Sequence, residues 1–161
     1  MIIGDVRTYL VPLADNDGYL NYLDSGGRGI VMLGGAVTGT QGLGTDLQGV
    51  RHHRDDPVPK PTPVDQWPQQ FHRDYQFRLR GVRDYNITLN CKLVPVVSET
   101  IEIAELDFDV VRVSETCTNA RRQIVNTYWA DADTGFIWKS VQWLGPELGQ
   151  ATIEIIRPYS G

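Results

Sequence analysis

The sequence has little of the residue types that carry metal, redox or nucleophilic chemistry. Its 161 residues include two cysteines and three histidines, and no CxxC pattern occurs. A zinc or redox motif needs more such ligands at short spacing, so neither motif is supported. No histidine lies beside a G-x-S-x-G turn, and no Ser-His-Asp arrangement is recognisable. The composition therefore predicts no cofactor and no metal site.

Long apolar runs and a basic stripe are also missing. No run approaches the roughly 18 residues that span a bilayer, and no signal-peptide pattern is visible at the start of the chain. Either the protein is cytoplasmic or a targeting segment lies outside this sequence. Lys and Arg number 15 against 20 Asp and Glu, a net charge of −5. This balance excludes the usual electrostatic footprint of a nucleic-acid-binding protein.

Apolar and polar residues alternate with a period of two over much of the chain. From Phe71 to Arg80, four of the five odd positions are apolar and every even position is polar. The run Asn86 to Leu93 alternates in the same way and places Cys91 on the apolar face. Such alternation is typical of strands with one buried and one solvated face.

The rest of the chain reads as short strands separated by turns. Turn-forming Gly, Asp and Asn recur about every ten residues, and no window keeps a helical apolar stripe. Further strands are expected at Val6–Val11, Gly18–Leu23, Gly29–Leu33, Ala36–Gln41, Thr100–Ala104, Phe108–Ser114, Gln123–Trp129, Phe136–Trp143 and Ala151–Arg157. We predict an all-β, mostly antiparallel barrel-like or sandwich fold of about 9–11 strands. A length of 161 residues predicts a single domain, residues 1–161.

The segment from about residue 52 to 68 has a different composition. It contains five prolines among mixed charges, which favours extended backbone and is incompatible with a central strand. We expect an exposed loop within the domain. The pair His52-His53 is expected to be solvated, because neighbouring side chains on extended backbone point apart.

Two short acidic motifs are best explained as a turn. Asp133-Thr134-Gly135 matches the aspartic-protease triplet, and Asp131-x-Asp133-x-Gly135 resembles the start of a calcium loop. The apolar flank of the protease motif and the terminal Glu of the calcium loop are both missing. A hairpin turn accounts for these residues, since Gly accepts positive φ and Asp bonds nearby backbone.

Bulky aromatic residues gather near the C-terminus. Three of four tryptophans, Trp129, Trp138 and Trp143, fall within 15 positions. Exposed Trp and Tyr beside Arg or Gln mark binding surfaces for sugars or proteins, whereas a sheet packed on both faces would bury them. The candidate contact residues are Tyr128, Trp129, Trp138, Gln142 and Trp143, with Arg73 and Arg121 as polar partners. Residue pattern alone leaves Cys91 and Cys117 either bridged or as two buried thiols.

Four blocks in order resemble the YjbF/GfcB family, whose members are lipoproteins encoded in exopolysaccharide and group 4 capsule loci of Gram-negative bacteria. The blocks are L-N-Y-L-D-S-G-G from Leu20, T-Q-G-L-G-T-D-L from Thr40, the pair Cys91 and Glu115-x-Cys117, and N-x-Y-W-x-D with its W-x-S-x-Q-W continuation from Asn126. Together they extend over about residues 18 to 158. Family members begin with a signal peptide and an acylated cysteine, and neither cysteine of this chain matches that position.

The resemblance implies a function and a location. We expect a non-enzymatic accessory lipoprotein for assembly or export of capsule or exopolysaccharide, which binds glycan or another protein of the secretion locus. It would lie in the periplasm, attached to the outer membrane through a lipid anchor absent from this sequence. The periplasm is oxidising, so the resemblance favours a structural Cys91–Cys117 disulfide.

Two other classes of function remain open at this point. A lipocalin-like barrel carrying a small hydrophobic ligand would need a continuous apolar cavity. A glycan hydrolase would need two carboxylates about 5 to 9.5 Å apart in a cleft. The candidates for such a pair are Asp107, Asp109, Glu115, Asp131 and Asp133.

Overall fold

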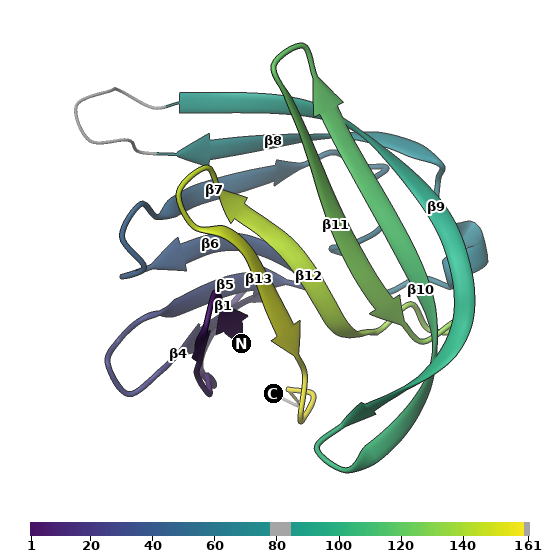
Figure 1. Cartoon of the computed structure of the whole chain (residues 1–161), viewed down its shortest axis with the longest axis horizontal. Helices are drawn as coiled ribbons and strands as arrows, with labels where there is room; N and C mark the ends of the chain where they lie inside the picture. The colour runs from purple at the N-terminus through teal and green to yellow at the C-terminus, as the bar shows by residue number, and fades with distance from the viewer. Residues whose placement is uncertain (78–84, 160–161) are drawn as a thin grey trace.

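The computed structural model describes residues 1–77 and 85–159, and antiparallel β-strands make up most of it (Figure 1). The expected all-β class is confirmed. Within the described ranges, the one helical element is a single 3-10 turn, η1 (Val64–Gln66). No helix in these ranges is long and apolar enough to cross a membrane.

The larger sheet contains nine strands in the order β2-β1-β13-β12-β11-β10-β9-β8-β7. From β7 to β13 each strand pairs with the next one in the sequence, so this part is a meander, and β1 joins its far end by pairing with β13. The strands are β1 (Ile2–Ile3), β2 (Val6–Arg7), β7 (Leu47–His52), β8 (Gln70–Phe77), β9 (Tyr85–Ile103), β10 (Leu106–Asn119), β11 (Arg122–Ala130), β12 (Ile137–Gly145) and β13 (Gly149–Glu154).

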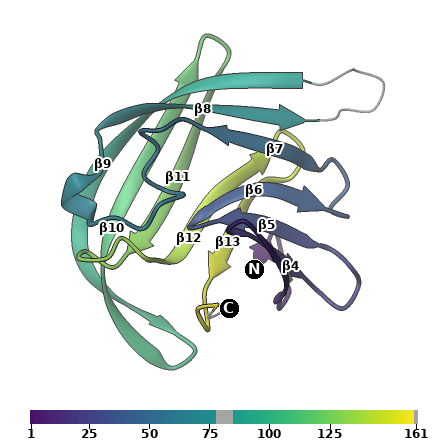
Figure 2. The same cartoon turned by 180° about the vertical axis from the view of Figure 1, so that it is seen from behind.

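The smaller sheet has four strands in sequence order, β3 (Val11–Asn16), β4 (Tyr19–Leu23), β5 (Gly29–Leu33) and β6 (Ala36–Gln41). The larger sheet curves strongly, and β6 lies beside β7 without joining its hydrogen-bond ladder (Figure 2). The two sheets therefore form a sandwich-like arrangement and not a closed barrel. Both chain ends lie at the same end of the molecule, near β4 and β13 (Figure 1).

The alternation of apolar and polar residues along the sequence corresponds to an alternation of buried and exposed side chains in the structure. On β8, Phe71, Arg73, Tyr75 and Phe77 are buried, while the even positions face outward. The same pattern places Cys91 in the interior. The expected strand positions 78 to 80 lie outside the described residues.

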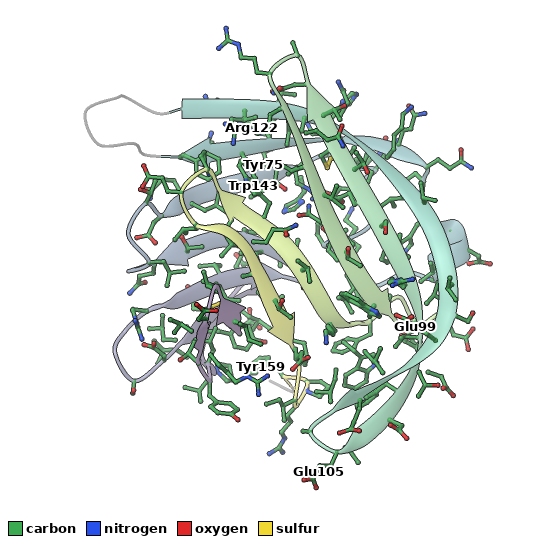
Figure 3. All side chains as sticks on the ribbon, in the orientation of Figure 1. Tyr75, Glu99, Glu105, Arg122, Trp143 and Tyr159 are labelled. Atoms are coloured by element: carbon green, nitrogen blue, oxygen red, sulfur yellow. A yellow bond between two sulfur atoms is a disulfide. The ribbon has the colours of Figure 1, made fainter. Side chains whose placement is uncertain are left out.

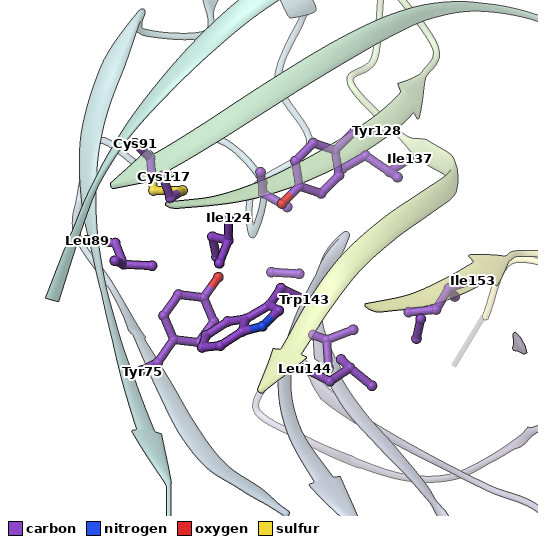
Figure 4. Packing of buried hydrophobic residues seen from close by; sticks show 14 of the residues in the cluster. Tyr75, Leu89, Cys91, Cys117, Ile124, Tyr128, Ile137, Trp143, Leu144 and Ile153 are labelled. Atoms are coloured by element: carbon purple, nitrogen blue, oxygen red, sulfur yellow. A yellow bond between two sulfur atoms is a disulfide. The ribbon is translucent and has the colours of Figure 1, made fainter. Parts of the chain in front are cut away.

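The main core fills the concave side of the larger sheet (Figure 4). Tyr75 and Phe77 from β8 both meet the indole of Trp143 from β12 edge-to-face, with ring centroids 5.2 and 5.4 Å apart. Tyr128 and Leu144 are fully buried in the same cluster. Edge-to-face aromatic pairs add stabilisation beyond the area they bury, so these rings hold β8 against β12 across the sheet's curve.

Several strand boundaries differ from the expected ones. The described residues hold thirteen strands, because β1 and β7 were not expected, Val6–Val11 divides between two sheets, and two expected strands join in β9. Thr100–Ala104 is the end of the single long strand β9, which runs through Pro95. A register shift at this point pairs Arg112 with Val97 and Val113 with Pro95. A bulge of this kind accommodates a proline, because the ladder hydrogen bond is already interrupted there.

The proline-rich segment is not exposed along its whole length, which corrects the expectation for residues 52–68. The four residues from Asp56 to Pro59 are buried, and Trp67 is only 9% exposed. The segment is hydrogen-bonded to two turns, from Gly35 N–H to the Val58 carbonyl and from Val64 N–H to the Ala132 carbonyl. Prolines favour extended backbone, but apolar contact and these hydrogen bonds hold the segment against the sheets.

Candidate functional site

A buried ionic cluster forms where β8 and β10 face the proline-rich segment. The Arg73 guanidinium donates to both oxygens of Asp56 at 2.8 and 2.9 Å, and to both oxygens of Glu115 at 2.8 and 3.0 Å. All three residues are at most 2% exposed. One cation thus bridges two carboxylates in paired, charge-assisted hydrogen bonds, the geometry in which an Arg–carboxylate pair is strongest.

Neighbouring polar groups complete this cluster. Asn126 donates its side-chain amide to Glu115 at 2.5 Å and accepts from the Trp143 backbone N–H at 2.8 Å. The Tyr128 hydroxyl lies 3.4 Å from Glu115, and His52 Nδ1 lies 2.7 Å from Asp56. The N-x-Y block therefore directs two side chains inward at one carboxylate, since alternate residues of a strand share a face.

The cluster changes the acidity of its members. Burial alone would raise the pKa of the Asp56 carboxyl, but the Arg73 charge and the His52 hydrogen bond hold it well below its usual range. Burial, and then the Glu115 charge, raise the pKa of Tyr128 well above its ordinary value. Asp56 is therefore ionised and Tyr128 neutral near pH 7.

The disulfide predicted from the resemblance is present beside this cluster. Cys91 on β9 lies directly opposite Cys117 on β10, and the two sulfurs are bonded (Figure 4). The Cys117 sulfur is 3.2 Å from Glu115 Oε1. Cys91, Cys117 and Glu115 are close enough together to ligate a metal, but the sulfurs ligate as thiolates and here they are bonded to each other. The cluster is therefore a structural centre.

A second group of side chains lies on the convex face of the larger sheet. Trp129 is partly exposed, donates its indole N–H to Glu99 at 2.5 Å, and lies under the Lys139 ammonium at 5.6 Å. Arg112 is 3.8 Å from Glu99, and Lys139 is 2.8 Å from Glu154. The charges around this indole are therefore paired with each other and close to neutral in sum.

Trp138 extends the convex-face group toward the β9–β10 hairpin. Its ring lies 4.2 Å from the Phe108 ring and 4.7 Å from the Phe136 ring, between centroids. A register shift beside Trp129 pairs Trp129 with Lys139 and Ala130 with Ile137, which leaves Trp138 as the extra residue of a bulge. We call Glu99, Phe108, Arg112, Trp129, Trp138 and Lys139 the outer aromatic surface.

The residues predicted as contacts are divided between the two faces. Tyr128, Trp143, Gln142 and Arg73 are interior, at 0 to 8% exposure. Trp129 and Trp138 are partly exposed on the outer aromatic surface, and Arg121 is exposed in the turn between β10 and β11. The structure therefore brings two of the seven together where an external ligand could reach them, and leaves Arg121 apart.

Eight residues of these two groups were not predicted as contacts, and Glu115, Asn126, Glu99 and Asp56 among them show why. Glu115 and Asn126 belong to the blocks that resemble the family, so the signal was present without a role attached. Glu99 and Asp56 had no local signal for their contacts with Trp129 and Arg73, because these partners are 30 and 17 positions away. Arg73 did have a local signal in the sequence, since it occupies a position of the alternation that is otherwise apolar.

The architecture places the protein among antiparallel two-sheet β proteins with a disulfide-linked interior. The family described as "Group 4 capsule polysaccharide lipoprotein gfcB, YjbF" matches residues 3–156, and the chain belongs to this family. A crystal structure titled as the hypothetical lipoprotein YmcC from Escherichia coli (K12) superposes with a TM-score of 0.81 at 21% identity, over 97% of this chain and 80% of that one. At this identity the similarity establishes the fold alone. No curated protein matches the chain.

Proposed function

We propose that this protein is a non-enzymatic accessory factor for assembly or export of a surface polysaccharide, and that it binds the glycan through the outer aromatic surface. The observation that supports the role most strongly is the match to the capsule polysaccharide lipoprotein family over residues 3–156. The family description names a lipoprotein, which supports an envelope location through a lipid anchor. Our proposal places the protein in the periplasm at the outer membrane, beside other proteins of the secretion locus.

The chemistry of the outer aromatic surface suits a sugar ligand. An indole face stacks on the apolar face of a pyranose ring, while charged and amide groups bind its hydroxyls. Trp129 has Glu99, Arg112 and Lys139 around it, which together offer hydrogen-bond donors and acceptors. Because these charges are paired, we expect the site to take neutral stretches of glycan.

The surroundings of two of the five candidate acids, Glu115 and Asp131, support a role without catalysis. Glu115 is fully buried and bonded to Arg73. Asp131 accepts from the Thr134 hydroxyl at 2.6 Å and from the Thr134 N–H at 2.8 Å, and these hydrogen bonds, the hydroxyl first, lower the pKa of its carboxyl. Both carboxylates therefore have structural partners, and the D-T-G triplet is part of this turn.

We expect Trp129→Ala to weaken binding of polysaccharide fragments at least about tenfold, since truncating a central aromatic contact costs 2 kcal/mol or more at many interfaces. Purified protein would be titrated with oligosaccharides from the producing strain's own polymer, by calorimetry and by tryptophan fluorescence. Tyr19→Ala is the matched control, because Tyr19 is 41% exposed on the smaller sheet. Equal affinities of the wild type and Trp129→Ala for the oligosaccharides would contradict the assignment of the outer aromatic surface as the glycan site.

A further inference from the structure

An apolar groove lies between the smaller sheet and the end of the chain. Two hollows of about 260 and 150 Å³ share Tyr22, Met32 and Ile155 in their walls. The inter-sheet groove is lined by these residues and by Leu10, Val11, Leu20, Ile30, Ile137, Ile153, Ile156 and Arg157. A combined volume of a few hundred Å³ with mainly apolar walls is typical of small-ligand sites.

The rim of the groove exposes large apolar side chains to solvent. Tyr9, Val11 and Ile156 line the larger hollow and are 73%, 63% and 55% exposed. Tyr159, at the end of the chain below β13 (Figure 3), lines the smaller hollow and is 43% exposed. Exposed apolar side chains that are concentrated around a hollow are typical of an interaction site.

The backbone around the groove disfavours an added peptide strand. Strand addition requires a row of free N–H and C=O groups along a sheet edge. The edge strand β3 contains Pro12, which has no N–H, and its register shifts between Pro12 and Ala14. Pro158 lies in the opposite wall. Prolines and irregular pairing are features that protect edges from strand addition. The occupant should therefore bind without backbone hydrogen bonds.

The charge at the mouth of the groove is positive. Glu154 lines the larger hollow, but Lys139 neutralises it at 2.8 Å. Arg157 lines the same hollow, is exposed, and has no carboxylate within 4 Å among residues 1–77 and 85–159. A local cation in a chain of net charge −5 complements an anionic headgroup.

We propose that the inter-sheet groove binds an amphiphile that has a single alkyl chain and an anionic headgroup. The alkyl chain lies along Tyr22, Met32 and Ile155, and the headgroup lies at Arg157. The site is separate from the outer aromatic surface, so it does not depend on the glycan-binding proposal.

The test compares two probes with the same tail, laurate and dodecyltrimethylammonium, each below its micellar concentration. Calorimetry and native mass spectrometry would measure affinity and stoichiometry. We expect one laurate per chain, bound at least tenfold more tightly than the cation, although the overall charge of the protein favours the cation. Tighter or equal binding of the cation by the wild-type protein would overturn the proposal, as would laurate binding without saturation.

Two pairs of variants localise the site. Ile156→Asp should abolish laurate binding, whereas Val97→Asp, at a 48% exposed position of β9, should leave it unchanged. Arg157→Glu should remove the preference for laurate, and Arg121→Glu should retain it. Thermal unfolding by circular dichroism would check that each variant is folded. If Ile156→Asp does not fold, the exposed Arg157→Glu variant decides the question, and a retained laurate preference in that variant would refute the proposal.

Discussion

Arg73 is the residue on which the interior charges depend. It lies between Asp56 and Glu115, and each carboxylate receives two of its hydrogen bonds. A buried ion pair is not in itself strongly stabilising, because desolvation offsets the attraction, but removing one partner leaves an uncompensated buried charge. The cluster therefore makes the fold sensitive to a single substitution at its centre.

Replacing Arg73 by Met should lower the free energy of unfolding by about 3–5 kcal/mol, because two buried carboxylates lose their cation. Urea denaturation followed by tryptophan fluorescence would measure the change. Arg121→Met removes the same charge from an exposed turn and should stay within about 0.5 kcal/mol of wild type. Similar effects of the two substitutions would contradict the central role of Arg73.

The depressed pKa of Asp56 predicts acid sensitivity. Below the ordinary carboxyl pKa of about 4, the unfolded chain takes up a proton at Asp56 that the folded protein does not, so stability falls as pH falls. Asp131 contributes in the same direction through its hydrogen bonds with Thr134. Urea unfolding between pH 6 and pH 2 would show a shallower slope for Asp56→Asn than for wild type. The exposed neighbour variant Asp55→Asn should keep the wild-type slope, and an unchanged slope in Asp56→Asn would refute this account.

At the scale of elements, close packing of the proline-rich segment is decided by glycine. A Cβ at Gly135 would lie within 1.9 Å of the Thr62 carbonyl oxygen, and one at Gly34 within 2.4 Å of the Pro59 carbonyl oxygen. Both glycines also have positive φ, which side chains disfavour. The turn after β11 and the turn after β5 therefore accept the segment because each has a bare backbone at the contact.

Gly135→Ala should destabilise the protein by roughly 1–3 kcal/mol more than Gly149→Ala, because the added methyl group would clash with the Thr62 carbonyl and overpacking typically costs this much. Both glycines have a φ of 71°, but nothing lies within 4 Å of a Cβ at Gly149. The control thus has the backbone strain without the clash. Chemical denaturation would measure the free energy of unfolding of both variants. Equal decreases in the two variants would mean that the proline-rich segment moves aside without a loss of stability, which would contradict this account.

At the scale of the whole molecule, side-chain hydrogen bonds connect the two sheets, and Gln142 makes two of them. Gln142 on β12 accepts from the Val37 N–H of β6 at 3.0 Å and donates to the Gly35 carbonyl at 2.8 Å. These contacts lie between the two sheets that do not share a ladder. The Gln142 side-chain amide therefore replaces some of the backbone hydrogen bonds that would form if the two sheets were paired.

Gln142→Leu should lower the free energy of unfolding by about 1–3 kcal/mol, because it leaves the buried Val37 N–H and the partly buried Gly35 carbonyl without these partners. Gln76→Leu, on the exposed side of β8, is the matched control and should have little effect. Hydrogen exchange at the Val37 amide would report the loss directly. Unchanged protection of this amide in Gln142→Leu would contradict its role in connecting the sheets.

The alternation of apolar and polar residues predicted the strands that have one solvent-exposed face. It failed for strands whose position depends on tertiary contacts. β5 and β6 begin and end at the predicted residues, because turn-forming glycines bound them locally. β7 was not predicted, since apolar and polar residues do not alternate strictly along it: Leu47 is buried, but Val50 is only partly buried. For the contact residues, pattern indicated that the tryptophans diverge, but it did not indicate which of them face solvent.

The amino-acid sequence by itself determined the all-β class, the inward side of each alternating strand and the turn at Asp133-Thr134-Gly135, because these follow from interactions between residues a few positions apart. Only the tertiary structure decided that Arg73 meets Asp56 and Glu115, that Trp129 is accessible while Trp143 is covered, and that a groove opens between the sheets. Those outcomes depend on how a coiled sheet brings strands together over separations of 17 to 107 residues. No local periodicity encodes that curvature.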